Sequence, residues 1–227
     1  MNRFFVPPGT TAAERFPLPG SIAHQVRRVL RLRDGDRVAL LEGDGRLAVC
    51  RVAGDDCVVE ERREVGGEPR HRLTVCQALL KGDALDHVVR QGTEIGVAAF
   101  RLVLTERCVA REVSDRRLER LRAIAREAAE QSERGVVPGV DAPVPLREML
   151  APESVVLYER NDGITLGQLP PPASIVIGPE GGFSPAEVEA AQAVGATLAG
   201  LGPRILRAES VALSAATVVL ARAGDFA

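Results

Sequence analysis

The segment Gly178–Gly182 combines residue types that could bind a small ligand and act on it. Gly178, Gly181 and Gly182 surround Glu180 directly after the apolar run Ser174–Ile177. Glycines let a ligand lie against the backbone, and a carboxylate among them could accept a proton. The segment has neither the G-x-G-x-x-G spacing nor the Gly-Lys-Ser/Thr sequence of phosphate-binding loops. A nucleotide phosphate is therefore not the first ligand expected, and a plain turn with positive φ is the alternative.

A second loop whose residues could bind a ligand or take part in a reaction follows the predicted strand Thr197–Leu201. Gly202 and Pro203 must turn the chain, and Arg207 and Glu209 then stand beside the start of a predicted helix. That helix, from about Ala208 to Ala221, is rich in small residues, which permit close helix packing. The sequence leaves open whether this small face belongs to the core or to a subunit contact.

Strands and helices that alternate along the chain must position these loops. Ser184 as N-cap, Pro185 at the first helical position and Glu187 three residues after the cap predict a helix start. The predicted strands are Leu73–Leu80, Phe100–Thr105, Ser154–Tyr158, Ser174–Ile177 and Thr197–Leu201. The predicted helices are Ala84–Ile95, Asp115–Glu133, Pro185–Val194 and Ala208–Ala221. This order indicates an α/β domain with a mostly parallel sheet, whose ligands bind at the carboxyl ends of the strands.

The first part of the chain follows a different pattern. Three short apolar runs, separated by glycine and aspartate turns, predict strands at Arg37–Glu42, Leu47–Val52 and Cys57–Glu61. A helix is expected at Ser21–Arg31, where Arg27, Arg28, Arg31 and Arg33 could form a basic patch, the alternative being ordinary solvated charge. Because Glu64–Arg70 reads as a linker, we expect one domain at residues 1–70 and another at 71–227.

Composition limits the classes of function. The 227 residues include 3% aromatic residues, no Trp and a net charge of -2, which argues against rows of base-stacking side chains and against a generally basic surface. Lys81 is the single lysine, so almost all of the positive charge is arginine. Arginine suits bidentate phosphate contacts, and the alternative is that the bias reflects the base composition of the genome. Four scattered cysteines and three histidines predict neither a zinc site nor disulfides. Without a membrane-length apolar run or a signal-peptide pattern, a globular cytoplasmic protein is expected.

Taken together, motifs along the whole chain resemble those of the ribosomal RNA small subunit methyltransferase E family, which methylates N3 of a uridine in the decoding region with S-adenosylmethionine. The matching segments are Arg3–Phe5, His24 with Val29–Arg31, Gly35–Asp36, Thr93–Val97, Glu127–Ser132 with Arg134 and Pro138, Ile177–Phe183, Leu201–Gly202, Arg204–Arg207 and Glu209. The chain departs from the family pattern at Gln91-Gly92, where Lys-Ala is usual, and at Ala208 and Ser210, where Thr is usual.

The resemblance implies a SPOUT methyltransferase domain with a deep trefoil knot, a PUA-like β-barrel for RNA, a homodimer, and 16S ribosomal RNA, within the small subunit, as partner. It also implies that S-adenosylmethionine is held by Ile177, Gly178, Gly181, Gly182, Leu201, Gly202, Ile205 and Leu206. We expect no metal and no membrane contact.

Uridine N3 carries a proton at neutral pH, so methylation requires a proton acceptor. We expect Glu209 or Glu180 to accept it, and Arg207 to stabilise the negative charge on the uracil oxygens. The RNA contacts are expected at Arg3, Arg27, Arg28, Arg31, Arg126 and Arg134. A ribose 2′-O-methyltransferase of the same superfamily and a non-enzymatic RNA-binding assembly factor are the alternatives.

Overall fold

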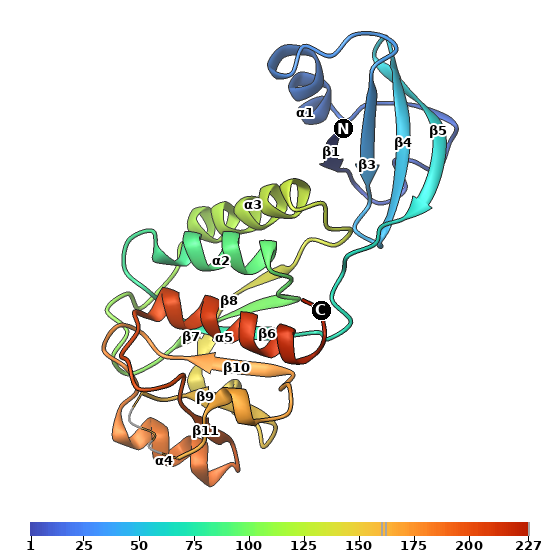
Figure 1. Cartoon of the computed structure of the whole chain (residues 1–227). Helices are drawn as coiled ribbons and strands as arrows, with labels where there is room; N and C mark the ends of the chain where they lie inside the picture. Colours follow the sequence, from blue (N-terminus) through green and yellow to red (C-terminus); the bar gives the residue numbers. More distant parts are fainter. Residues whose placement is uncertain (160, 162, 227) are drawn as a thin grey trace. The chain divides into compact units, whose positions relative to one another are not determined.

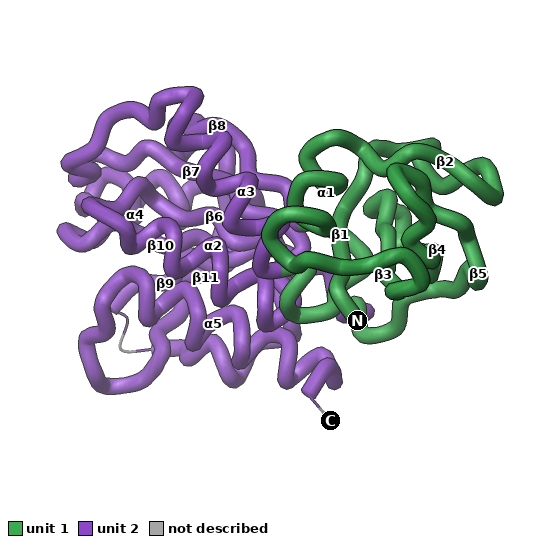
Figure 2. The backbone as a smooth tube through the Cα atoms, turned by 90° about the horizontal axis from the view of Figure 1, so that it is seen from above, with its two compact units in different colours: residues 1–68, 129–137 green, residues 69–128, 138–227 purple. Residues whose placement is uncertain are grey.

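The computed structural model describes residues 1–159, 161 and 163–226, and the chain divides into two compact units. Unit 1 comprises Met1–Glu68 and Ala129–Val137, and unit 2 comprises Pro69–Ala128 and Pro138–Ala227 (Figure 2). A short segment in the middle of the sequence therefore packs with the amino-terminal unit.

Unit 1 is built on a five-stranded sheet (Figure 1). Its strands are β1 (Asn2–Phe5), β2 (Arg15–Pro17), β3 (Arg37–Leu41), β4 (Arg46–Ala53) and β5 (Asp56–Glu64), in the order β1-β3-β4-β5-β2. β1 pairs parallel to β3 and the other neighbours are antiparallel. The three strands predicted from apolar runs are confirmed. β1 and β2 were not predicted, because runs of four and three residues are too short to show a period.

The predicted helix of unit 1 is confirmed as a helical segment of two kinds. α1 (Gly20–His24) continues directly into η1 (Gln25–Val29), a π-helical turn. Val26 anchors this segment in the apolar core formed with Phe4, Leu40 and Cys50. The helix ends two residues earlier than expected, and Arg31 adopts a left-handed backbone with φ +55°. π-helical turns are rare in proteins, and those that occur often lie at functional sites.

Unit 2 has a six-stranded, entirely parallel sheet, which confirms the predicted α/β class. Its strands are β6 (Thr74–Ala78), β7 (Ala99–Leu104), β8 (Gly139–Pro145), β9 (Ser154–Leu157), β10 (Ser174–Ile177) and β11 (Thr197–Ala199), in the order β11-β9-β10-β6-β7-β8. The edge strand β8 was not predicted, because Pro143 and Pro145 interrupt the pattern and proline is tolerated mainly in edge strands.

The helices of unit 2 begin and end close to the predicted residues. They are α2 (Ala84–Glu94), α3 (Asp115–Gln131), whose last residues belong to unit 1, α4 (Pro185–Ala193) and α5 (Ala208–Arg222), with short 3-10 turns η2 (Leu146–Glu148) and η3 (Leu166–Gln168). The Ser184–Glu187 capping box at the start of α4 is confirmed. α4 packs on the sheet face of Cys76 and Val176, whereas α2 and α5 lie on the opposite side (Figure 1).

The small-residue face of α5 belongs to the core of the chain. Ala208, Ala212, Ala215 and Ala216 are all buried, and α5 packs against α2, β10 and β6. Close packing also explains Gly92 on α2, which stands where the family usually has Ala. A Cβ atom at Gly92 would stand 2.7 Å from the ring of Phe100, so the ring leaves no room for a side chain at this position.

Candidate methyl-donor pocket

Because all strands of the unit 2 sheet are parallel, the loops that leave β9, β10 and β11 meet at one edge. They enclose a cavity of about 630 Å³, within the roughly 300–1,000 Å³ range of ligand pockets. All eight residues predicted to hold the methyl donor line it, as do the three predicted catalytic residues. The further lining residues are Lys81, Ala84, Leu157, Tyr158, Glu159, Pro179, Phe183, Ala199, Arg204, Ala208 and Val211.

Neighbouring elements hold the glycine loop Gly178–Gly182 in place. Arg107, just after β7, donates from Nη1 to the carbonyl oxygen of Gly181 at 2.9 Å. Gln77 on β6 is fully buried and donates from Nε2 to the carbonyl oxygen of Gly178 at 3.3 Å. Gly182 has φ +67°, and a Cβ atom there would stand 3.1 Å from Oε1 of Glu159. The loop therefore depends on glycine both for its backbone conformation and for space.

The second loop, Leu201–Leu206, supplies apolar side chains and backbone groups. Gly202 turns the chain with φ +99°, and Ile205 is 84% exposed. In the described part of the chain, the backbone N–H and C=O groups of Leu201, Ile205 and Leu206 have no hydrogen-bond partner. The preceding residue is fixed, because Leu166 N donates to the carbonyl oxygen of Gly200 at 2.9 Å. This loop thus offers donors, acceptors and an apolar surface to a ligand.

The charged residues of the cavity come from four loops, those after β6, β9, β10 and β11, and from the start of α5. Oε1 of Glu180 accepts a hydrogen bond from the backbone N–H of Lys81 at 2.9 Å, which ties the glycine loop to the loop after β6. Arg207 is the N-cap residue of α5 and Glu209 lies in its first turn, where the helix dipole favours a negative charge. The cavity therefore brings carboxylates and cations together beside apolar walls.

The residues present fit S-adenosylmethionine. Its adenine ring is flat and neutral, so it needs apolar walls and backbone donors and acceptors rather than a phosphate cradle. Leu157, Ile177 and Leu201 provide such walls, and the backbone of the second loop is available for hydrogen bonds. The three glycines remove the side chains that would otherwise fill the space next to the loop.

The arginines predicted to contact RNA are divided between the units. Arg28 is exposed within the π-helical turn and Arg31 is exposed just after it, near the exposed apolar side chains of Val29 and Leu30 in the sequence. Arg27 is partly exposed and forms an ion pair with Asp34 at 3.1 Å. Arg126 is exposed on α3 in unit 2.

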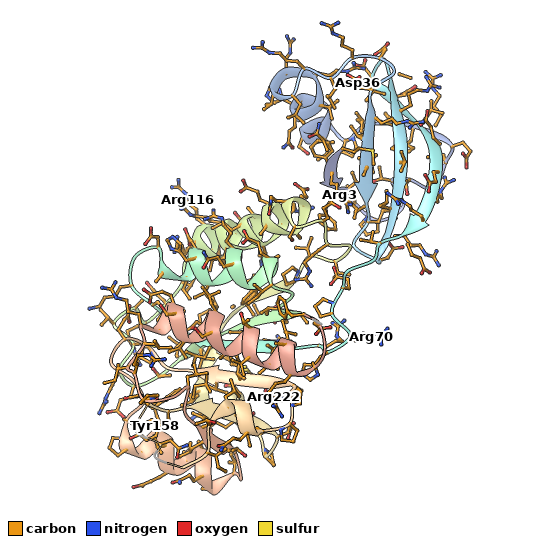
Figure 3. All side chains as sticks on the ribbon, in the orientation of Figure 1. Arg3, Asp36, Arg70, Arg116, Tyr158 and Arg222 are labelled. Carbon is orange, nitrogen blue, oxygen red and sulfur yellow. The ribbon has the colours of Figure 1, made fainter. Side chains whose placement is uncertain are left out.

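Besides Arg27, two of these arginines take part in ion pairs inside unit 1. Arg134 is 5% exposed, and its Nη2 lies 2.8 Å from Oε2 of Glu68. Arg3, labelled in Figure 3, has a side chain that is 12% exposed and pairs with Glu133 at 2.5 Å. The burial and the ion pair of Arg134 fit a structural role rather than an RNA contact. The spacing of residues in the sequence does not distinguish these two roles.

Of the eleven lining residues that sequence reasoning did not predict, four have polar side chains: Lys81, Tyr158, Glu159 and Arg204. Lys81 carried a usable signal, since it follows the predicted strand Leu73–Leu80 on the carboxyl side, where ligands bind in parallel sheets. Tyr158 is the last residue of the predicted strand Ser154–Tyr158 and Glu159 follows it; both come after the observed β9. Arg107 gave no signal, because its contact with Gly181 bridges 74 positions of sequence.

Other site classes find no support among residues 1–159, 161 and 163–226. No group of three His, Cys, Asp or Glu side chains there could hold a metal ion. Cys50, Cys57, Cys76 and Cys108 are all buried free thiols. No helix in the same described part is long and apolar enough to cross a membrane.

Comparison with known proteins agrees with this geometry. The RNA methyltransferase domain family matches residues 67–220, and the RNA methyltransferase PUA domain family matches residues 18–59. The fold and the cavity thus define a two-domain RNA methyltransferase. A ribosomal RNA small subunit methyltransferase E from Bacillus subtilis is 32% identical over 96% of this chain and 96% of its own, and one from Synechocystis is 37% identical over 88% and 69%. The chain belongs to the ribosomal RNA small subunit methyltransferase E family.

Solved structures extend this likeness to the whole fold. The enzyme of this name from Neisseria gonorrhoeae, bound to S-adenosyl methionine, superposes with a TM-score of 0.86 at 29% identity over 95% of each chain. A methyltransferase from Legionella pneumophila, in complex with the same cofactor, gives a TM-score of 0.84 at 27% identity over 96% of each chain.

Proposed function

We propose that this protein methylates N3 of a uridine in the decoding region of 16S ribosomal RNA, with S-adenosylmethionine as the methyl donor. The proposal is based mainly on one observation: the glycine loop and the Leu201–Leu206 loop line the same cavity. Membership in a family whose members are named for this substrate supports the choice of ribosomal RNA. The fit of the cavity to an adenosyl group supports the donor.

When bound, S-adenosylmethionine supplies a methyl group on a positively charged sulfur, which takes back the bonding pair as the methyl leaves. The chain must place uridine N3 within about 3–3.5 Å of that methyl group. Ile177, Gly178, Gly181, Gly182, Leu201, Gly202, Ile205 and Leu206 form the donor side of the cavity. Their fixed loops do this work by positioning, because the displacement itself requires no group on the protein to form a bond.

The proton on N3 must leave before or during attack, and a cavity carboxylate accepts it. Glu209 is the stronger candidate, because one oxygen of Glu180 already accepts the Lys81 N–H. Glu180 remains the alternative through its second oxygen. Arg207, next to Glu209 at the start of α5, stabilises the negative charge that spreads to the uracil oxygens.

RNA contact falls mainly to unit 1. Arg28 in the π-helical turn and Arg31 just after it are exposed cations, and Arg31 holds a left-handed conformation that costs a non-glycine residue about 1–2 kcal/mol. Such a conformation at an exposed cation supports a functional role. Arg27 extends the basic surface of unit 1, Arg126 is a separate candidate contact on unit 2, and Arg3 is largely engaged with Glu133.

Three features of architecture complete the proposal. The unit 1 sheet closes into a PUA-like barrel, which the match to an RNA methyltransferase PUA domain supports, and the carboxy-terminal part of unit 2 forms a trefoil knot. The exposed Ile205 next to the cavity supports a homodimer within which this loop is covered. Light scattering of the purified protein tests the dimer, and an experimentally traced chain tests the knot and the barrel.

The reaction is tested by nucleoside analysis of small subunits from cells that lack this protein, incubated with the purified enzyme and labelled S-adenosylmethionine. The proposal expects 3-methyluridine. A 2′-O-methylated nucleoside would contradict the base specificity, and no label in any RNA would contradict the activity. Glu209→Gln and Arg207→Ala proteins that still bind the donor should turn over at least tenfold more slowly.

A further inference from the structure

Lys81 stands apart from every other basic residue of this chain. The sequence has 29 lysine and arginine residues, and Lys81 is the single lysine. Among so many arginines, the one side-chain ammonium group belongs to a residue that lines the methyl-donor cavity. Neither the reaction scheme above nor the predicted site assigns it a role.

The loop that carries Lys81 is held firmly against the glycine loop. The backbone N–H of Lys81 donates to Oε1 of Glu180 at 2.9 Å, and Gly82 follows with φ +59°. Lys81 is exposed and lines the cavity, and no hydrogen bond or ion pair in the described part of the chain engages its ammonium group. The backbone is therefore fixed while the charge is available to a ligand.

The strand order places Lys81 on the side of the cavity left for the methyl acceptor. The donor residues come from the loops after β10 and β11, and β9 lies between these strands in the order β11-β9-β10-β6. Lys81 follows β6, on the other side of β10. A base that approaches the donor from the β6 side meets Lys81 and Glu180 together.

We propose that Lys81 is a catalytic residue whose ammonium group contacts a uracil oxygen and stabilises the uridine anion from which N3 attacks. This inference rests on the proposed function. Lys81 stays protonated throughout: the N3 proton passes to a cavity carboxylate, N3 supplies the new bonding pair, and the sulfur–carbon pair returns to sulfur. The ammonium group only lowers the energy of the anion.

The choice of lysine supports a uracil contact over a phosphate contact. Arginine presents a planar fork that matches phosphate oxygens, and this chain uses arginine at every other basic position. An ammonium group is a compact point charge with three donors, which suits a single carbonyl oxygen inside a small cavity. A phosphate clamp would have been served equally well by arginine.

The test compares wild type with Lys81→Met, Lys81→Arg and the control Arg116→Ala, whose exposed side chain lies on α3 outside the cavity residues (Figure 3). Methylation rates are measured from pH 6 to pH 10 on small subunits, and the Kd values for donor and RNA are measured separately. We expect Lys81→Met to slow turnover on the order of tenfold to a hundredfold at neutral pH and to raise the apparent pKa of its rate profile by about 1. Lys81→Arg should restore the wild-type profile in part, and Arg116→Ala should match wild type.

Three outcomes would overturn the assignment. A weaker Kd for RNA with a reduced salt dependence and an unshifted pH profile would make Lys81 a phosphate contact. A weaker Kd for S-adenosylmethionine would make it a donor contact, and unchanged turnover would exclude any role. These outcomes differ from failure of the proposed function, in which wild type itself forms no 3-methyluridine.

Chemical modification gives an independent measurement on the unmutated chain. Acetylation removes the charge of an amine, whereas reductive dimethylation keeps it, and apart from the amino terminus Lys81 is the only amine. Acetylated wild type should lose turnover while the dimethylated protein keeps it. The Lys81→Arg protein, modified in the same way, controls for the amino terminus; equal losses in both proteins would contradict the assignment.

Discussion

Nη1 of Arg107 donates a hydrogen bond to the carbonyl oxygen of Gly181 at 2.9 Å, so the loop after β7 supports the loop that faces the methyl donor. Glu106 strengthens this support, because its backbone N–H donates to Oε1 of Glu187 at 2.7 Å. Two hydrogen bonds thus connect the β7 loop with the segment from the glycine loop to α4.

Loss of the Arg107 side chain should loosen the glycine loop. We expect Arg107→Ala to weaken binding of S-adenosylmethionine by about threefold to tenfold, the loss associated with one hydrogen bond. Isothermal titration calorimetry measures it, with Arg90→Ala on the exposed surface of α2 as the matched control. A Kd equal to that of wild type would mean that the loop keeps its conformation without this contact.

A methyl group at Gly182 should disturb both the loop and the cavity wall. Gly182→Ala requires φ +67° of an alanine and places Cβ 3.1 Å from Glu159 Oε1. The backbone strain costs about 1 kcal/mol of unfolding free energy, and the displaced carboxylate should weaken donor binding. Gly167→Ala, where a Cβ meets no atom within 4 Å, is the control in urea unfolding and calorimetry. Similar behaviour of the two variants would contradict the role of Gly182.

The ion pair between Glu68 and Arg134 should make unit 1 sensitive to acid. Burial alone would raise the pKa of Glu68, but hydrogen bonds and charge from Arg134, with the N–H groups of Gly135 and Val136, hold it below the ordinary 4.5. Because the pKa of Glu68 is lower in the folded than in the unfolded state, its ionised carboxylate stabilises the fold above pH 4.5. This stabilisation is lost as the pH falls through the folded-state pKa.

Glu68→Gln removes that charge, so it should cost about 1–3 kcal/mol at pH 7 and progressively less as the pH falls below 4.5. Urea unfolding of both proteins at several pH values measures the difference. A difference that is independent of pH would show that the charge of Glu68 contributes nothing.

The buried thiols should be unreactive in the native protein. Burial raises the pKa of Cys50 to about 12, and those of Cys57 and Cys76 to about 11. Because the thiolate is the reactive form, these three should react with an aromatic disulfide reagent at pH 8 only as the protein unfolds, and all four cysteines should react in denaturant. Rapid native-state labelling of Cys50 would contradict the packing of the unit 1 core.

The sequence predicted those parts of the fold that local patterns encode. Ser174–Ile177 and the Ser184–Glu187 capping box are local and were predicted at the observed residues. Contacts between residues far apart in the sequence could not be predicted. Examples are the hydrogen bond from Gln77 to the carbonyl oxygen of Gly178 and the ion pair of Arg134 with Glu68. The exposed charge expected of Arg134 depends on burial, which one sequence does not reveal. Placement of Ala129–Val137 in unit 1 depends in the same way on tertiary packing.

The account depends most on the cavity between the glycine loop and the Leu201–Leu206 loop as the site of the methyl donor. A crystal structure of this protein grown with S-adenosylmethionine tests it directly. We expect the adenine ring against Leu201 and Ile205, with the sulfonium methyl group facing the open side near Lys81 and Glu209. Density for the donor outside this cavity, or no binding at saturating concentration, would contradict the account.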